Sequence, residues 1–478
     1  MVERGNAKRA VTLHRGALFT PTGRREFRGW EDGCVAVGSD GRIAAVGDFT
    51  AVAGDYPSAR VTDWRPAAIL PGLVDLHSHV PQYSAVAMDG YELLPWLERF
   101  IFPAEAAFAD RPRAHEEAGR FFADALATGT TAACLYVTVH EEATGAAFEA
   151  AEGAGIRACI GKVMMDRNAP APLLEETGKS LAASERLCRE WNGAAGGRLR
   201  YVFTPRFAVT CTPELMRGAA ELAQAHDALI QTHLAENQDE VNLVARLFPA
   251  SASYTDVYGE AGLLGARTIM AHCVLLSAGE YDLLASTRTR IAHCPSSNFF
   301  LRSGIMDMAM ADQREMVVGL GSDVGAGPSL SLFKEMANAC YASKALYAME
   351  RLGRSRLADL EAEFAGLPSG PELYRRVTER LGLASPARLV GPAQAFYLAT
   401  LGGAEALGLA DEIGSLAPGK WADFVVVDLR AVDPAFGEYS RTADEMLSQI
   451  VFRADPRAVV ATHVAGRQVH ASEAAVTQ

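Results

Sequence analysis

Two histidines one residue apart, His77 and His79, close an apolar run that is typical of a buried strand. In a strand, residues i and i+2 share one face, so both imidazoles should point the same way. Two neutral imidazoles at a strand end make half of a site for zinc, iron, copper or nickel. Two surface histidines would also satisfy this common spacing, so the prediction depends on partners elsewhere in the chain.

His233 and Asp323 are the predicted partners, and each lies at or after the end of a further β-type run. A catalytic zinc site uses about three protein ligands and keeps a position for water. We expect the metal ligands to be His77, His79, His233 and Asp323, with Asp323 also acting as a general base toward the water. An ion held in this way lowers the pKa of its water to near neutrality and so makes it a nucleophile.

Three further polar residues are candidates for the same pocket. Glu236 stands three residues after His233 and is expected to shuttle a proton to the substrate, although a solvated glutamate at a helix start is the alternative. His272 ends another β-type run and is expected to orient the water or to replace a ligand; the alternative is a core histidine. For His293, a place in the pocket wall and a structural role are equally open.

The elements that must position these residues are apolar, β-branched runs that alternate with amphipathic stretches, which is typical of parallel βα units. We expect eight strands and therefore a (β/α)8 barrel, whose active site lies at the carboxyl ends of its strands. The candidate residues do end or follow predicted strands. The predicted strands are Ile69 to Leu76, Thr130 to Tyr136, Arg157 to Val163, Leu199 to Phe203, Ala228 to His233, Thr268 to His272, Arg290 to His293 and Met316 to Gly321.

Both ends of the chain carry shorter β-type runs, and Ser39–Gly41 has the composition of a hairpin turn. We expect residues 1–70 and 412–478 to form one small β-sandwich domain and residues 71–411 to form the barrel. Lys162 would lie below the end of the third strand, and no other lysine closes a strand. A carbamylated lysine at a strand end could bridge two metal ions. Because no lysine is predicted at such an end, we expect one metal ion.

Composition excludes several classes of protein. The net charge of −13 argues against a nucleic-acid partner, and 49% hydrophobic with 22% charged residues indicates a folded globular chain. There is no signal-peptide pattern and no long apolar run. We therefore expect a cytoplasmic location and no membrane association. Eight scattered cysteines indicate reduced thiols, and a catalytic role for Cys273 or Cys294, each next to a histidine, is not favoured.

The chain resembles the amidohydrolase superfamily in its predicted site, which combines an H-x-H pair with two histidines and an aspartate on later barrel strands. Several segments then resemble its guanine deaminase family over nearly the whole chain. They are Pro71–Tyr83, Trp96–Glu105, Thr204–Phe207, Gln231–Asn237 with Asp239–Val241, Met270–His272 and His293–Asn298.

The resemblance implies one zinc ion, with ferrous iron possible, and hydrolytic deamination of guanine to xanthine and ammonia. It implies that Glu236 protonates a ring nitrogen and that Asp323 accepts the proton of the water. Gln82 and Arg206 match purine-anchoring positions, and Phe207 offers a ring to the base. The alternatives for Gln82 and Arg206 are a loop-capping amide and a surface ion pair. Related barrels imply a homodimer.

Two other functions remain open at this point. One is a related amidohydrolase that deaminates another aminopurine, a pterin or a triazine; the segment 352–392, longer than expected after the eighth strand, puts the substrate range in question. The other is a metal-free scaffold protein, which would be expected to show gaps in the ligand set, and the sequence has none.

Overall fold

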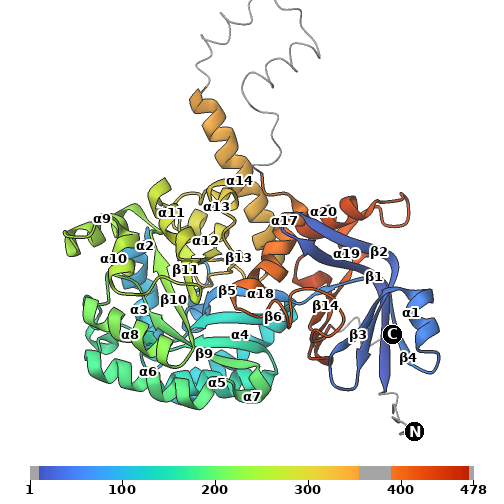
Figure 1. Ribbon diagram of the computed structural model, residues 1–478, viewed down its shortest axis with the longest axis horizontal. Coiled ribbons are helices and arrows are strands. Elements are labelled where there is room, and N and C mark those ends of the chain that lie inside the picture. The colour runs from blue at the N-terminus through green and yellow to red at the C-terminus, as the bar shows by residue number, and fades with distance from the viewer. Residues whose placement is uncertain (1–9, 355–388, 473–478) are drawn as a thin grey trace, which may run out of the picture.

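The computed structural model describes residues 10–354 and 389–472. The chain forms a barrel of parallel strands surrounded by helices, and a separate sheet stands beside the barrel (Figure 1). None of the helices within the described ranges is long and apolar enough to cross a membrane.

The barrel confirms the predicted (β/α)8 architecture. Almost every residue of its strands is buried, because helices cover the outside and side chains fill the interior. A short extra strand, β8 (Val163–Met164), pairs with β9 just beyond the end of β7. In order around the barrel, the strands are β5 (Leu73–His79), β6 (Thr130–Tyr136), β7 (Arg157–Gly161), β9 (Leu199–Pro205), β10 (Leu229–Leu234), β11 (Thr268–His272), β12 (Arg290–His293) and β13 (Val318–Leu320).

Two of the predicted strands are divided in the structure, and three others differ from the observed strands by one or two residues at their ends. The run Ile69 to Leu76 belongs to two strands, β4 (Arg60–Pro71) in the separate sheet and β5 in the barrel. The chain passes between them at Gly72, where a Cβ atom would lie 2.0 Å from the Oγ1 of Thr131. The predicted third strand is interrupted at Lys162, whose side chain turns away to Glu175 with an Nζ–Oε1 distance of 2.6 Å.

The helices around the barrel begin at local sequence signals. Thr212 caps α8, with Pro213 as its first residue, and Asn237 forms a capping box with Glu240 at the start of α9. The helices along the barrel are α2 (Leu93–Trp96), α3 (Phe102–Ala107), α4 (Arg111–Ala127), α5 (Glu141–Ala154), α6 (Thr177–Trp191), α7 (Ala194–Gly197), α8 (Pro213–Ala225), α9 (Gln238–Leu247), α10 (Tyr254–Glu260), α11 (Ala278–Ser286), α12 (Pro295–Phe300), α13 (Met308–Gln313) and α14 (Leu332–Arg354).

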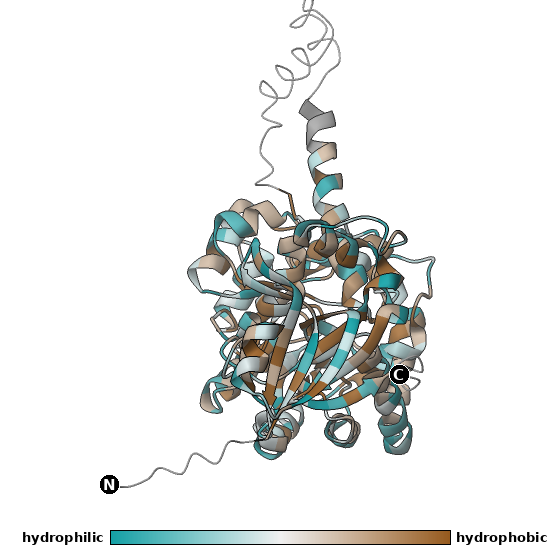
Figure 2. Cartoon of the chain, turned by 90° about the vertical axis from the view of Figure 1, so that its right-hand side faces the viewer, coloured by the Kyte–Doolittle hydropathy of each residue, from teal (hydrophilic) through white to brown (hydrophobic). Residues whose placement is uncertain are grey.

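The separate sheet has seven strands and joins both ends of the chain, as predicted. Its order is β16–β15–β14–β4–β1–β2–β3, with Ser39–Gly41 forming the turn between β2 and β3. Seen from its own side, the sheet shows apolar and polar segments interspersed along its strands (Figure 2). The strands not yet given are β1 (Val11–Gly23), β2 (Glu26–Gly38), β3 (Ile43–Asp48), β14 (Phe424–Asp428), β15 (Val459–Val464) and β16 (Arg467–Ala471).

A buried ion pair connects the sheet with the barrel. Arg157, the first residue of β7, donates from Nε to the Oδ2 of Asp423 at 3.2 Å. The remaining helices lie with the sheet or between it and the barrel: α1 (Phe49–Asp55), α17 (Pro392–Tyr397), α18 (Gly403–Ala406), α19 (Leu429–Val432) and α20 (Ala443–Arg453). Most of the long segment predicted at 352–392 lies outside the described residues.

Candidate active site

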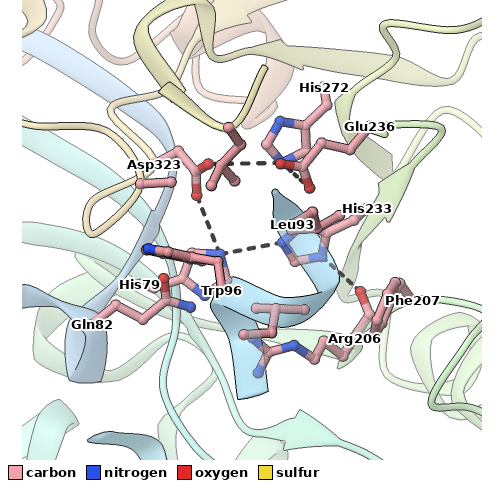
Figure 3. A pocket seen from close by; sticks show the side chains of 13 residues that line it. His79, Gln82, Leu93, Trp96, Arg206, Phe207, His233, Glu236, His272 and Asp323 are labelled. Carbon is pink, nitrogen blue, oxygen red and sulfur yellow. Dashed lines mark hydrogen bonds and ion pairs between the residues drawn. The ribbon is translucent and has the colours of Figure 1, made fainter. Parts of the chain in front are cut away.

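Three imidazole nitrogens and a carboxylate oxygen meet at the carboxyl end of the barrel. Figure 3 shows three of these residues, His79, His233 and Asp323. The Nε2 atom of His79 lies 3.3 Å from that of His77 and 3.2 Å from that of His233. The Oδ1 atom of Asp323 lies 3.1 Å from His77 Nε2 and 3.4 Å from His79 Nε2. The structure therefore brings together all four residues that the sequence predicts as metal ligands.

The chemistry of this donor set fits a divalent metal ion. Burial lowers the pKa values of His77, His79 and His233, which favours the neutral imidazole that binds metals. Burial alone would raise the pKa of Asp323, but the adjacent His77 lowers it to about 2, so the carboxylate is ionised. Three neutral imidazoles and one carboxylate suit zinc and ferrous iron alike.

Hydrogen bonds behind the cluster fix the orientation of its rings. His233 Nδ1 lies 2.7 Å from the backbone carbonyl oxygen of Arg206, so that nitrogen carries the proton and the Nε2 lone pair faces His79. Asp75 lies beneath His77 and accepts hydrogen bonds from the backbone N–H and the hydroxyl of Ser322, next to Asp323. These hydrogen bonds hold the candidate metal ligands in one geometry, although the ligands come from strands that are far apart in the sequence.

His272 lies above the cluster, where it can orient a water or replace a ligand. Its Nε2 atom is 3.8 Å from Asp323 Oδ2 and 3.4 Å from Glu236 Oε2. With His77 and Asp323 it forms a second group whose ligand atoms lie within 4.8 Å of one another. Its Nδ1 atom lies 2.9 Å from Oδ1 of Asn298, a residue that the sequence alone did not single out.

Glu236 projects into the same space from the loop between β10 and α9. Its backbone N–H donates to the Oε2 of Glu240 at 2.8 Å, so the capping box of α9 holds the loop. Burial, followed by the nearby charge of Asp323, raises the pKa of Glu236 well above its ordinary value. A carboxyl group that keeps its proton at neutral pH can serve as a general acid.

The backbone around these groups is strained. His272, Asp323 and Ala235, which precedes Glu236, have φ values of 71°, 46° and 50°. Residues other than glycine occupy this left-handed region at a cost of about 1–3 kcal/mol each, and such strain concentrates at functional sites. In this chain it occurs at His272, at Asp323 and at the residue before Glu236.

A pocket opens beside the cluster. Gln82, from the 3₁₀ turn after β5, and Arg206 and Phe207, from the loop after β9, form one wall, as Figure 3 shows. Both Gln82 and Arg206 are bonded to Glu105, a buried residue of α3 whose role sequence reasoning missed. The other lining residues are His79, Leu93, Trp96, Leu97, His233, Glu236, His272, Leu301, Asp323 and Ala326.

The remaining candidates lie away from the pocket wall. His293 is buried and does not line the pocket, and burial lowers its pKa to about 3. Lys162 is paired with Glu175 on the outer side of the strands. All eight cysteines are buried free thiols, and burial raises the pKa values of Cys273 and Cys294 well above their ordinary value, which makes both poor nucleophiles.

Known proteins with the same architecture are similar to this chain over nearly its whole length. The model of the amidohydrolase family matches residues 68–358 and 373–469. The guanine deaminase of Escherichia coli (strain K12) is 36% identical over 92% of this chain and 91% of its own length. The guanine deaminase of Homo sapiens is 33% identical over 84% of this chain and 82% of its own length.

Solved structures agree with the sequence comparison. A crystal structure of guanine deaminase from C. acetobutylicum, with guanine bound in its active site, superposes with a TM-score of 0.83 and 30% identity. The match covers 96% of this chain and all of the other, 100%. The chain belongs to the amidohydrolase family and, within it, to the guanine deaminases.

Proposed function

We propose that this chain hydrolyses guanine to xanthine and ammonia. One observation carries the proposal: a wall of polar side chains that suits a purine faces a cluster that suits a hydrolytic metal, across one pocket. The similarity to guanine deaminases, one of them solved with bound guanine, supports the same substrate. The reaction consumes one guanine and one water and releases the exocyclic amino group as ammonia.

His77, His79, His233 and Asp323 would hold the metal. The ion, when bound, would supply Lewis acidity that lowers the pKa of a water molecule. We favour one ion, because Lys162, the lysine closest to a strand end, is already paired with Glu175. Zinc is the proposed ion, and ferrous iron suits the same ligands.

The protein's own groups account for the proton transfers. Asp323 is ionised and can accept a proton from the attacking water. Glu236 retains its proton through burial and can donate it to a ring nitrogen as C2 is attacked. His272 lies within 4 Å of both carboxyl groups and would orient the water between them.

Substrate binding is assigned to the opposite wall. Arg206 and Gln82 can form hydrogen bonds with the purine's oxygen and ring nitrogens, and the ring of Phe207 can pack against the base. His233, Glu236 and Asp323 also line the pocket, so the reacting carbon would lie among them. No step requires a charged substrate.

Location and assembly complete the proposal. A cytoplasmic location suits a chain whose eight cysteines are all free thiols. A homodimer is the proposed assembly. Sedimentation analysis of the purified chain tests the latter, and a monomer at micromolar concentration would contradict it.

A substrate screen tests the activity. Purified protein loaded with zinc is incubated with guanine, and the formation of xanthine and ammonia is followed. The same sample is tested with other aminopurines, a pterin and an aminotriazine. We expect the highest kcat/KM with guanine; a value at least about tenfold higher for another amine would assign a different substrate, and no turnover by metal-loaded protein would overturn the proposal.

A further inference from the structure

Glu105 is a buried carboxylate that binds both substrate-facing polar residues of the pocket wall. Its Oε1 atom accepts a hydrogen bond from Gln82 Nε2 at 3.2 Å, and its Oε2 atom accepts a short one from Arg206 Nη1. The Glu105 side chain is 0% exposed and does not line the pocket, whereas both partners do. Glu105 therefore stands behind the wall and acts on it through two side chains.

The position of Glu105 is itself fixed. It belongs to α3, and the hydroxyl of Thr138, just after β6, donates to its backbone carbonyl at 3.1 Å. The ring of Phe102, in the same helix, faces the guanidinium of Arg206 with 5.4 Å between the ring centroid and Cζ. One helix thus supplies both the carboxylate and the aromatic face that hold Arg206.

We propose that Glu105 is a positioning residue that sets the specificity of this pocket for an uncharged base with an oxo group. The inference rests on the proposed deamination of guanine. With one Gln82 N–H held by Glu105, the amide keeps its carbonyl oxygen and its second N–H for a ligand. Arg206 keeps its remaining N–H groups for the oxo oxygen of the base.

Charge supports the same conclusion. The buried guanidinium of Arg206 and the buried carboxylate of Glu105 cancel, so the wall offers directed donors without a net charge. An unpaired buried arginine would attract anions in general. Paired with Glu105, Arg206 therefore no longer favours anions in general. It can instead donate hydrogen bonds to a carbonyl oxygen on a neutral ring.

Two ligands separate this role from simple support of the fold. Guanine carries the 6-oxo group, and 2-aminopurine, which competes with guanine for the pocket whether or not it is itself deaminated, lacks it. In Glu105→Gln, which keeps the shape of the side chain, we expect kcat/KM for guanine to fall by at least about tenfold, mostly through KM. The inhibition constant for 2-aminopurine should change by a smaller factor than kcat/KM for guanine, because that ligand lacks the oxo group and offers Gln82 and Arg206 its ring nitrogens alone.

Glu175→Gln is the matched control, since Glu175 also forms an ion pair, partly buried, with Lys162, but lies outside the pocket. Glu175→Gln should lower the melting temperature. It should leave unchanged the ratio of kcat/KM for guanine to the inhibition constant for 2-aminopurine. Should Glu105→Gln fail to fold, Glu105→Asp keeps the charge but is one methylene too short to reach both partners, and it should show the same loss of discrimination.

The outcomes are distinct. Equal changes for both ligands, or unchanged guanine kinetics in a folded Glu105 variant, would overturn the positioning role. Absence of guanine turnover in the wild type and in Glu175→Gln would instead contradict the proposed function. In that case, isothermal titration of wild type and Glu105→Gln with guanine still tests the inference, and equal affinities would overturn it.

Discussion

Asp323 is bonded to His77 through both its backbone and its side chain. Its N–H donates to the His77 carbonyl at 2.8 Å, and its Oδ1 lies 3.1 Å from His77 Nε2. A second backbone bond, from His79 N–H to the carbonyl of Val324 at 3.3 Å, lies beside it. These contacts join the first and last strands of the barrel, so the proposed metal ligands lie where the barrel closes.

Removal of the metal is therefore expected to lower stability as well as activity. An ion that binds only the folded state stabilises it by mass action, and here it would also tie β5 to the segment after β13. Protein treated with a chelator and then freed of it should melt at a lower temperature and show no turnover, and added zinc should restore both. Calorimetry and metal analysis on one sample check this. Full activity at negligible metal content would contradict the assignment of these ligands.

Glu236→Gln should impair catalysis without loss of metal or fold. The amide keeps the size of the side chain and cannot release a proton, so kcat should fall by about a hundredfold or more, the usual range for a general acid. Glu152→Gln, a substitution on the exposed face of α5, is the matched control and should keep wild-type kinetics. If Glu236→Gln turned over guanine at the wild-type rate, Glu236 would have no part in proton transfer.

Local sequence patterns are enough to predict the part of the site that lies on barrel strands. The alternation of side chains in a strand predicts that His77 and His79 share a face, and the structure confirms it with a 3.3 Å separation of their Nε2 atoms. The rule that active sites lie at the carboxyl ends of barrel strands then brings His233, His272 and Asp323 to the same place.

Residues that act across the fold escape such reasoning. Glu105 lies on a short helix, and nothing in its own segment indicates that it meets Gln82 and Arg206. Asn298 lies on α12, 26 residues from His272 in the sequence, and meets it only in the folded barrel. The division of the predicted strand Ile69 to Leu76 between the two sheets also escapes such reasoning, since the apolar run continues across Pro71 and Gly72.

The ion pair between Arg157 and Asp423 should be important for stability. Both side chains are buried between the barrel and the separate sheet, and Asp423 also accepts the backbone N–H of Ala465 at 2.6 Å. Asp423→Ala leaves Arg157 buried without its partner and should lower the free energy of unfolding by about 3–5 kcal/mol. Replacement of both residues, Arg157→Met with Asp423→Leu, should recover much of this loss.

Denaturant unfolding monitored by circular dichroism checks these values. The exposed pair of Arg111 and Glu149 is the control, because surface ion pairs contribute little. If the double variant were as unstable as Asp423→Ala, the loss of stability in Asp423→Ala would not come from the unpaired Arg157.

Glu335 is expected to make stability fall as pH rises. This residue of α14 accepts the backbone N–H of Ser296 at 3.1 Å, and burial raises its pKa to about 8 from an ordinary value of 4.5. Between these two values the folded state holds a proton that the unfolded state has released. Folding therefore becomes less favourable as the pH rises from about 4.5 to about 8. The stability that the protonated Glu335 contributes is fully present only below this range.

Glu335→Gln cannot titrate and keeps an oxygen for Ser296, so it should remove this dependence. The melting temperature of the variant minus that of the wild type should rise from about pH 5 to about pH 8 and level off beyond, since the wild-type carboxylate is then ionised in both states. Taking the difference cancels the titration of groups that do not interact with Glu335, such as the buried histidines His14 and His463 of the separate sheet. Glu152→Gln should give a flat difference, and a flat difference for Glu335→Gln would show that Glu335 ionises at its ordinary pKa in the folded protein.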